Sequence, residues 1–172
     1  MQIQAATQAA ADPSTVVSPS DFAKWTKGYL QTTFDALSGF TYPFPRVGKK
    51  LSDRKVVSPP AVQKLDNQKI SIKGYMLPID MDAKGVTMFM LQADLQSCCF
   101  GVHGDPNTYI LVTMAKKTRV SLFDAVTVYG TFHIGEVAHG ESIEDIESFY
   151  RLDGQAIAIH TESFDKVTGV DK

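Results

Sequence analysis

Short runs of alternating apolar and polar residues, typical of β-strands, dominate the chain after residue 68. Residues 69–77 and 125–134 alternate in this way, which predicts strands with one buried face. Residues 86–91 and 108–114 are apolar on both faces, as expected of central strands. A further short run at 155–160 completes a set of strands separated by hairpin-length connections.

Proline and glycine mark the places where these strands end or bend. Pro78 is expected to end the first strand, and residues 80–85 are expected to form a hairpin connection. Gly130 lies in the middle of a strand, where glycine commonly permits a sharp bend at the corner of a barrel. Residues 142–152 begin with a capping-box pattern and then alternate, so helix and strand both remain open. We favour a brief helical or irregular start followed by strand.

A helix is predicted from residue 21 to residue 38, ahead of the strands. Ser20 is a suitable N-cap, Asp21 places a negative charge in the first turn, and Gly39 can end the helix in a left-handed conformation. Apolar residues recur at helical spacing between these signals, and packing against a sheet explains such a stripe better than a ligand groove does. The stripe begins with Phe22, Trp25 and Tyr29, and Leu30, Phe34 and Leu37 continue it as a neighbouring stripe.

The remaining segments predict one domain with extensions. Residues 1–18 lack apolar periodicity and should form a flexible leader, whereas residues 19–46 should hold the helix and a proline-rich extended crossing packed on the barrel. Residues 47–163 should form the barrel domain, with a single helical turn at 58–65, and residues 164–172 a polar tail. The fold class is therefore mainly β (α+β), a small antiparallel OB-like barrel with an N-terminal helix; a β-sandwich is the alternative.

Composition and charge narrow the function. The chain has 172 residues, 44% of them apolar, and a net charge of −2 with scattered basic residues, which argues against a nucleic-acid partner. The acidic residues near 141–147 lack the spacing of a calcium loop. No run reaches the about 18 apolar residues that a membrane helix needs. The N-terminus lacks a signal peptide but would suit the start of a mature exported chain or a lipid-tethered lipoprotein.

The loop at 96–107 concentrates the unusual chemistry of the chain. It contains both cysteines, Cys98 and Cys99, together with His103, among glycines and an Asp-Pro-Asn turn. Thiolate and imidazole groups suit zinc or copper ions, and a tetrahedral site would need a further ligand. His133, on the polar face of its strand, is the best candidate for that ligand.

Other roles compete with metal binding. The thiols can simply pack the loop against the barrel, and a disulfide between sequence neighbours would be strained. His139, in a loop flanked by glycine, is a weaker ligand candidate than His133. No nucleophile elbow, phosphate loop or zinc-protease helix is present, which favours a non-enzymatic protein. The methionines that would suit copper more often fill core gaps, and they are Met76, Met81, Met88, Met90 and Met114.

An ordered set of short motifs between residues 38 and 159 resembles a bacterial family of exported proteins and predicted lipoproteins whose domain has no assigned function. Of the proposed site, the resemblance carries over a cysteine of the Cys98-Cys99 pair and the Phe-Gly that follows; His103 has no counterpart. The motifs are Gly74-Tyr-Met-Leu-Pro78, Phe89-Met-Leu91, Cys98-Cys-Phe-Gly101, Gly130-Thr-Phe-His-Ile-Gly-Glu136 and Phe149-Tyr-Arg-Leu152.

The resemblance implies a periplasmic or membrane-tethered accessory protein, with a membrane transport component, such as part of a metal-uptake system, as its partner. Two hypotheses follow. In the first, the chain is a non-enzymatic exported binding module that presents the loop 96–107 to a ligand or partner. In the second, it is a small zinc- or copper-binding or thiol-redox protein that uses Cys98 and Cys99 with His103.

Overall fold

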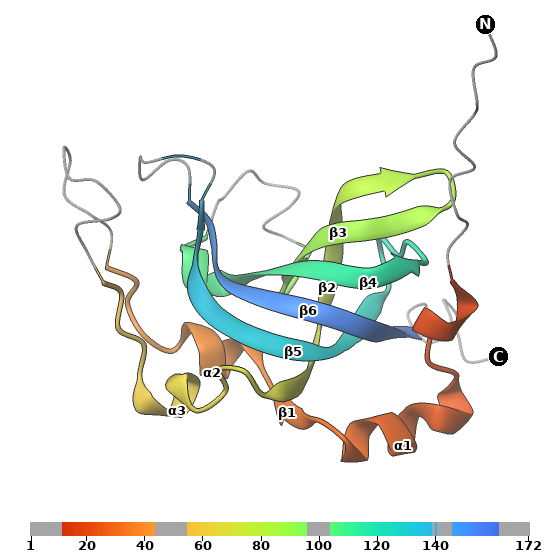
Figure 1. Ribbon diagram of the computed structural model, residues 1–172, viewed down its shortest axis with the longest axis horizontal. Coiled ribbons are helices and arrows are strands. Elements are labelled where there is room, and N and C mark those ends of the chain that lie inside the picture. The colour runs from red at the N-terminus through yellow and green to blue at the C-terminus, as the bar shows by residue number, and fades with distance from the viewer. Residues whose placement is uncertain (1–11, 44–54, 96–103, 139, 141–145, 162–172) are drawn as a thin grey trace, which may run out of the picture.

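A computed structural model describes residues 12–43, 55–95, 104–138, 140 and 146–161. The elements are drawn in Figure 1. In chain order they are the 3-10 turns η1 (Pro13–Thr15) and η2 (Pro19–Asp21), α1 (Phe22–Lys27), β1 (Leu30–Thr32), α2 (Phe34–Ser38), α3 (Pro60–Gln63), β2 (Lys69–Asp82), β3 (Gly85–Gln92), η4 (Pro106–Thr108), β4 (Tyr109–Thr118), β5 (Ala125–Ala138) and β6 (Ile146–His160). None of the helices in these ranges is long and apolar enough to cross a membrane.

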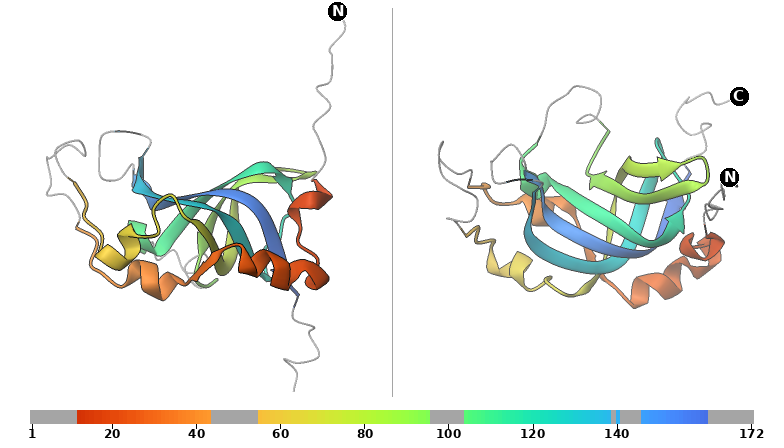
Figure 2. Two further views of the ribbon diagram at one scale, coloured as in Figure 1. Left: turned by 60° about the horizontal axis from the view of Figure 1, so that its bottom comes forward. Right: turned by 45° about the horizontal axis from the view of Figure 1, so that its top comes forward.

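Strands β2 to β6 close into a five-stranded barrel, which confirms the predicted mainly β fold. The strands follow the order β2-β3-β4-β6-β5, and pairing between β5 and β2 closes the ring. Figure 2 shows these strands curving around a common axis. Every contact around the ring is antiparallel except the one between β4 and β6, which run parallel. An odd number of strands cannot alternate direction around a closed ring, so one parallel contact is unavoidable.

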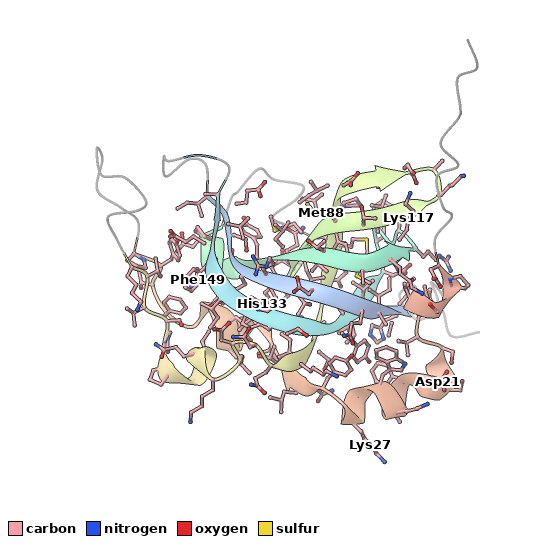
Figure 3. The ribbon with its side chains drawn as sticks, in the orientation of Figure 1. Asp21, Lys27, Met88, Lys117, His133 and Phe149 are labelled. Carbon is pink, nitrogen blue, oxygen red and sulfur yellow. The ribbon has the colours of Figure 1, made fainter. Side chains whose placement is uncertain are left out.

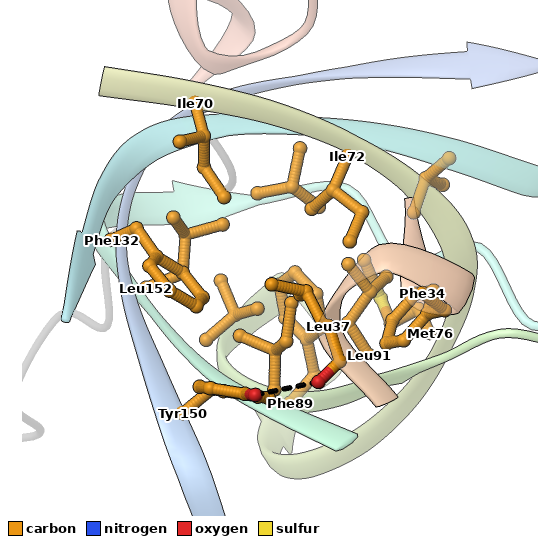
Figure 4. Close-up of a cluster of buried hydrophobic side chains, with 14 of the residues drawn as sticks. Phe34, Leu37, Ile70, Ile72, Met76, Phe89, Leu91, Phe132, Tyr150 and Leu152 are labelled. Atoms are coloured by element: carbon orange, nitrogen blue, oxygen red, sulfur yellow. Dashed lines mark hydrogen bonds between the residues drawn. The ribbon is translucent and has the colours of Figure 1, made fainter. Parts of the chain in front are cut away.

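Alternation along the strands fills the barrel with apolar side chains. Around the ring, Ile110 pairs with Tyr150, and Leu91 pairs with Ile110, so the inward residues form layers. The Tyr150 hydroxyl donates to the Leu37 carbonyl oxygen at 2.7 Å, which ties α2 to the core (Figure 4). The fully buried apolar residues include Leu37, Ile70, Phe89, Leu91, Ile110, Val112, Val126, Val128, Phe132, Tyr150, Leu152 and Ile157.

The strands are longer than the pattern predicts. β2 continues past Pro78 to Asp82, because irregularities in its pairing with β3 on either side of Asp80 absorb the proline. The predicted strand at 155–160 and the ambiguous segment before it form one strand, β6, which begins at Ile146. Residues 141–145 lie outside the described ranges. The predicted helical turn at 58–65 is confirmed as α3.

The single helix predicted at 21–38 is wrong, since the segment contains two short helices and a strand. α1 ends at Lys27, with Gly28 as its C-cap, and β1 then pairs in parallel with residues 70–72 of β2. Thr33 caps the start of α2 by accepting a hydrogen bond from the Ala36 amide at 3.2 Å. The apolar stripe is consequently divided. Phe34 and Leu37 enter the main core, whereas Trp25 packs on the outer face of β5 and β6.

Residues 12–18, which the sequence pattern assigns to a leader, contact the barrel. Thr15 and Val17 are buried, and the Val17 amide donates to the Ile157 carbonyl oxygen at 2.7 Å. The Asp12 amide donates to the Lys117 carbonyl oxygen at 2.7 Å. Hydrogen bonds from Ser14 and from Lys116 lower the pKa of Asp12 to about 2. Backbone pairing to strands supplies the anchoring that composition alone does not reveal.

Candidate binding site

The predicted site loop is described only at its C-terminal end, which we call the loop foot (residues 104–107). Cys98, Cys99 and His103 lie outside the described residues. Within the foot, the Asp105 carbonyl oxygen accepts hydrogen bonds from the Thr108 amide at 2.8 Å and from the Thr108 hydroxyl at 2.6 Å. Pro106 then starts the 3-10 turn η4, which leads directly into β4. The loop foot is thus a defined turn at the entry to a barrel strand.

Asn107 anchors the loop foot to the segment after α2. Its side chain is 1% exposed, and its Nδ2 donates to the Phe40 carbonyl oxygen at 2.9 Å. Its Oδ1 has no hydrogen-bond partner among the described residues. A buried amide oxygen without a hydrogen bond costs about 1–3 kcal/mol. Asn107 therefore anchors the loop foot through its Nδ2, while its Oδ1 is an acceptor that a ligand could use.

His133 lies on the outer face of β5 and is held by two neighbours. Its Nε2 is 2.9 Å from Oδ2 of Asp153 on β6, and its Nδ1 is 3.1 Å from Oδ1 of Asn67. Asn67 adopts a left-handed conformation with φ of 59° at the turn before β2. Both ring nitrogens of His133 are therefore engaged, so a metal ion would have to displace one of these partners.

Of the four predicted metal ligands, His133 alone is described, and His139 is also outside the described ranges. Among the residues that the structure describes, no group of three or more His, Cys, Asp or Glu side chains could hold a metal ion. The sequence-based hypothesis of a zinc or copper site therefore stays a prediction.

A cleft of about 560 Å³ opens beside the end of β5, between that strand and the segment that leads into α3. One wall is formed by residues 134–136, and Phe149 of β6 lies next to it. Figure 3 shows Phe149 and His133 toward the same end of the barrel. The described lining residues are Lys55, Val56, Val57, Ser58, Gln63, Asp66, Ile134, Gly135, Glu136 and Phe149.

Both carboxylates of the cleft already make hydrogen bonds to the chain itself. Asp66 Oδ1 accepts a hydrogen bond from the Ile134 amide at 3.0 Å, and Glu136 accepts one from the Tyr42 hydroxyl. The described lining contains neither cysteine nor histidine, so it offers no nucleophile paired with an imidazole base.

Aromatic contacts connect the cleft to the loop foot. The ring of Phe149 lies 6.3 Å from Phe40 and 5.6 Å from Tyr42, measured between ring centroids. Phe40 also accepts the hydrogen bond from Asn107, and Tyr42 donates the one to Glu136. We call the loop foot and the cleft together the loop end of the barrel. Residues 40–42 brace both parts of it.

The cleft is not among the features predicted from the sequence. Its signal is present, however, because Gly135 and Glu136 interrupt the alternation of the strand and belong to one of the quoted motifs. The structure shows the reason: the pairing of β5 with β6 passes from Ile134 opposite Tyr150 to Val137 opposite Ser148, and skips the residues between. The interruption is a bulge that forms one wall of the cleft.

A solved structure resembles this chain in fold. A crystal structure of a DUF3299 family protein from Pseudomonas aeruginosa PAO1 has a TM-score of 0.56 and 21% identity, and the match covers 78% of this chain and 98% of that one. A protein described as an aspartyl-tRNA synthetase from Leishmania major Friedlin has a TM-score of 0.41 and 13% identity, over 90% of this chain and 24% of that one. The second likeness carries no argument.

A search of curated proteins gave no match. The model of the family described as "Protein of unknown function (DUF3299)" matches residues 37–159, a range that contains every barrel strand in full except the last residue of β6. The chain belongs to the DUF3299 family.

Proposed function

We propose that this chain is a non-enzymatic binding module that contacts a partner through the loop end of its barrel. The observation that carries the proposal is the bracing by residues 40–42, which hold the loop foot through Asn107 and the cleft through Glu136 and Phe149. A rigid barrel that holds irregular segments in place is a common way to build a binding surface. Two adjacent irregular features on one support favour a shared role.

The chemistry of the cleft supports binding over catalysis. Its carboxylates accept hydrogen bonds from the Ile134 amide and the Tyr42 hydroxyl, which leaves them positioned as structural groups. The proposal includes export to the periplasm and a membrane transport component as the partner. Both of these come from the family resemblance of the sequence motifs rather than from the geometry.

A photo-crosslinking experiment tests the contact surface. A photoreactive amino acid replaces Asp105 in the loop foot in one variant and the exposed Lys24 of α1 in another. In native cells, the Asp105 variant should form a discrete adduct on irradiation and the Lys24 variant should not. Adding Asn107→Ala, which removes the anchor of the loop foot, should weaken the adduct at least about tenfold, equivalent to about 1.4 kcal/mol of binding free energy.

Thermal unfolding of the variants is the control. Equal adducts from both positions, or an adduct that declines only as far as Asn107→Ala lowers the folded fraction, would contradict a binding role for the loop foot. Protein purified without chelator should contain no stoichiometric metal. If the unchanged protein instead contains zinc or copper, and the Cys98→Ser or Cys99→Ser variant does not, the metal-binding hypothesis is correct.

A further inference from the structure

One wall of the cleft is a strand end that has lost a neighbour. β2 covers β5 only from Val126 to Thr131, and the turn before β2 then pairs with Phe132. At the next position the Asp66 side chain, rather than a strand, accepts the hydrogen bond of the Ile134 amide. Beyond Ile134, no described strand pairs with β5 on this side. Such an edge is a natural template for an added strand.

The opposite wall is the segment 55–58, which runs down to α3 (Figure 1). Within the described part of the chain, no hydrogen bond involves the main chain of Lys55, Val56 or Val57. Ser58 differs, because its carbonyl oxygen accepts a hydrogen bond from Gln63 Nε2 at 2.6 Å. The cleft therefore lies between a strand end that no described strand covers on this side and a segment, 55–57, whose main chain makes no hydrogen bond to the described residues.

The bulge at Gly135 keeps the strand side of the cleft open. Gly135 has a φ of 152°, which disfavours other residues, and a Cβ built there meets no atom of the described residues within 4 Å. The apolar floor is formed by Phe149, which is 2% exposed, together with the partly buried Val56 and Ile134. Backbone can approach the strand closely at this point, and an apolar side chain can rest on the floor.

The charged residues of the cleft differ in whether they already have partners within the chain. Asp66 and Glu136 hydrogen-bond to the chain itself, whereas Lys55 makes no ion pair with any described residue. Among the described lining residues, Lys55 is thus the charged group left for a ligand, and a carboxylate would complement it.

We propose that the cleft binds an extended peptide segment of a partner protein by β-strand addition. The peptide main chain pairs with the end of β5 and with residues 55–57, one apolar side chain lies over Phe149, and a carboxylate lies beside Lys55. The volume of about 560 Å³ falls in the range of about 300–1,000 Å³ that is usual for ligand sites. The inference rests on the proposed function and deepens it by naming the chemical class of the partner.

The test uses short peptides with the full chain. A phage-displayed library of short random peptides is selected on the immobilised protein, and the enriched peptides are synthesised and titrated by fluorescence anisotropy. They should share an apolar residue and a carboxylate. Methylating the peptide's backbone amides should weaken binding at least about tenfold. Lys55→Met should weaken the binding of peptides that contain a carboxylate, and it should leave the binding of their amidated or Asn-substituted forms unchanged.

Two protein variants locate the site. Gly135→Val fills the open side of the strand. Val57→Pro removes an amide that has no partner among the described residues, so this second variant should fold even if the first does not. Both variants should bind the peptides at least about tenfold more weakly than the unchanged protein does. Phe123→Ser, which changes an 81% exposed residue in the connection between β4 and β5, should have no effect.

Specific outcomes overturn the proposal. These are a library that yields no enriched peptide, methylated peptides that bind as well as unmodified ones, or Val57→Pro and Gly135→Val variants that bind normally. Concentration-dependent self-association that Val57→Pro abolishes would show that a second copy of this chain occupies the cleft, and would also overturn it. Because crosslinking at Asp105 does not depend on the cleft, failure of the peptide assay is distinguishable from failure of the proposed function.

Discussion

Tyr150 illustrates how much one buried polar group contributes at the scale of a residue. Its ring lies inside the barrel without exposure, and its hydroxyl donates to the carbonyl oxygen of Leu37 at the end of α2. Burial raises the pKa of Tyr150 well above the usual value of about 10, because the phenolate would lose its hydration. The hydrogen bond therefore persists at pH values where an exposed tyrosine ionises.

Replacing Tyr150 with Phe should lower the free energy of unfolding by about 1–3 kcal/mol at neutral pH, because the Leu37 carbonyl loses its donor in a dry site. The difference should shrink above pH 10. There the unfolded tyrosine releases its proton while the folded one keeps it, so the unfolded state binds fewer protons and stability falls as pH rises. The Phe variant lacks this contribution.

Urea unfolding of both proteins, in steps from pH 7 to pH 11, measures the difference directly. If the difference in unfolding free energy between the two proteins stayed constant across that range, the pKa of Tyr150 would not be raised in the folded protein.

At the scale of elements, the N-terminal segment shows that helical spacing does not by itself define a helix. Trp25 stacks on Tyr29 with ring centroids 5.8 Å apart, and both rings contact Tyr129 on β5. Leu30, which the periodicity places on a neighbouring stripe of the same helix, instead belongs to β1 and pairs with Ile70. Available backbone on the edge of β2 competes with helix continuation, and Gly28 makes the break inexpensive.

Trp25→Ala should lower the free energy of unfolding by roughly 1–2 kcal/mol, because it removes a partly buried ring from the outer face of β5. Lys24→Ala, at an exposed neighbouring position, is the matched control and should change stability by less than about 0.5 kcal/mol. Guanidinium unfolding followed by circular dichroism measures both. Equal effects would mean that α1 does not contribute its packing to the stability of the barrel.

At the scale of the whole molecule, closure of the barrel depends on a close approach between β5 and β6. A Cβ built at Gly130 would lie 2.4 Å from the Asp153 carbonyl oxygen and 3.0 Å from the Cα of Gly154. The register of the two strands shifts just before this point. Only a residue without a side chain allows the strands to cross this closely while β5 also pairs with β2.

Gly130→Ala should therefore destabilise the protein by about 1–3 kcal/mol or more, since the added methyl group must separate two paired strands. Because the ring is closed, the loss should appear in a single cooperative unfolding transition rather than as fraying of one strand. Gly28→Ala is the control, since its added Cβ has only an ordinary contact at 3.6 Å. Differential scanning calorimetry decides, and an unchanged midpoint for Gly130→Ala would refute the close-approach argument.

Local pattern was sufficient for the barrel because strand burial follows directly from the alternation of side chains. Residues 69–77 and 125–134 were identified from that alternation alone, and both lie within β2 and β5. The candidate site was harder to predict. The loop foot was named from its composition, but the cleft was not, because its walls come from segments about 80 residues apart that meet only in the fold.

The sequence by itself determined the mainly β class, the approximate positions of the strands and the presence of an irregular loop before β4, since each follows from periodicity and turn residues within a short window. Only the tertiary structure decided that β4 and β6 run parallel, that residues 12–18 dock and that the segment 21–38 divides. These features arise when distant backbone groups find hydrogen-bond partners, and no local pattern records which distant partner is available.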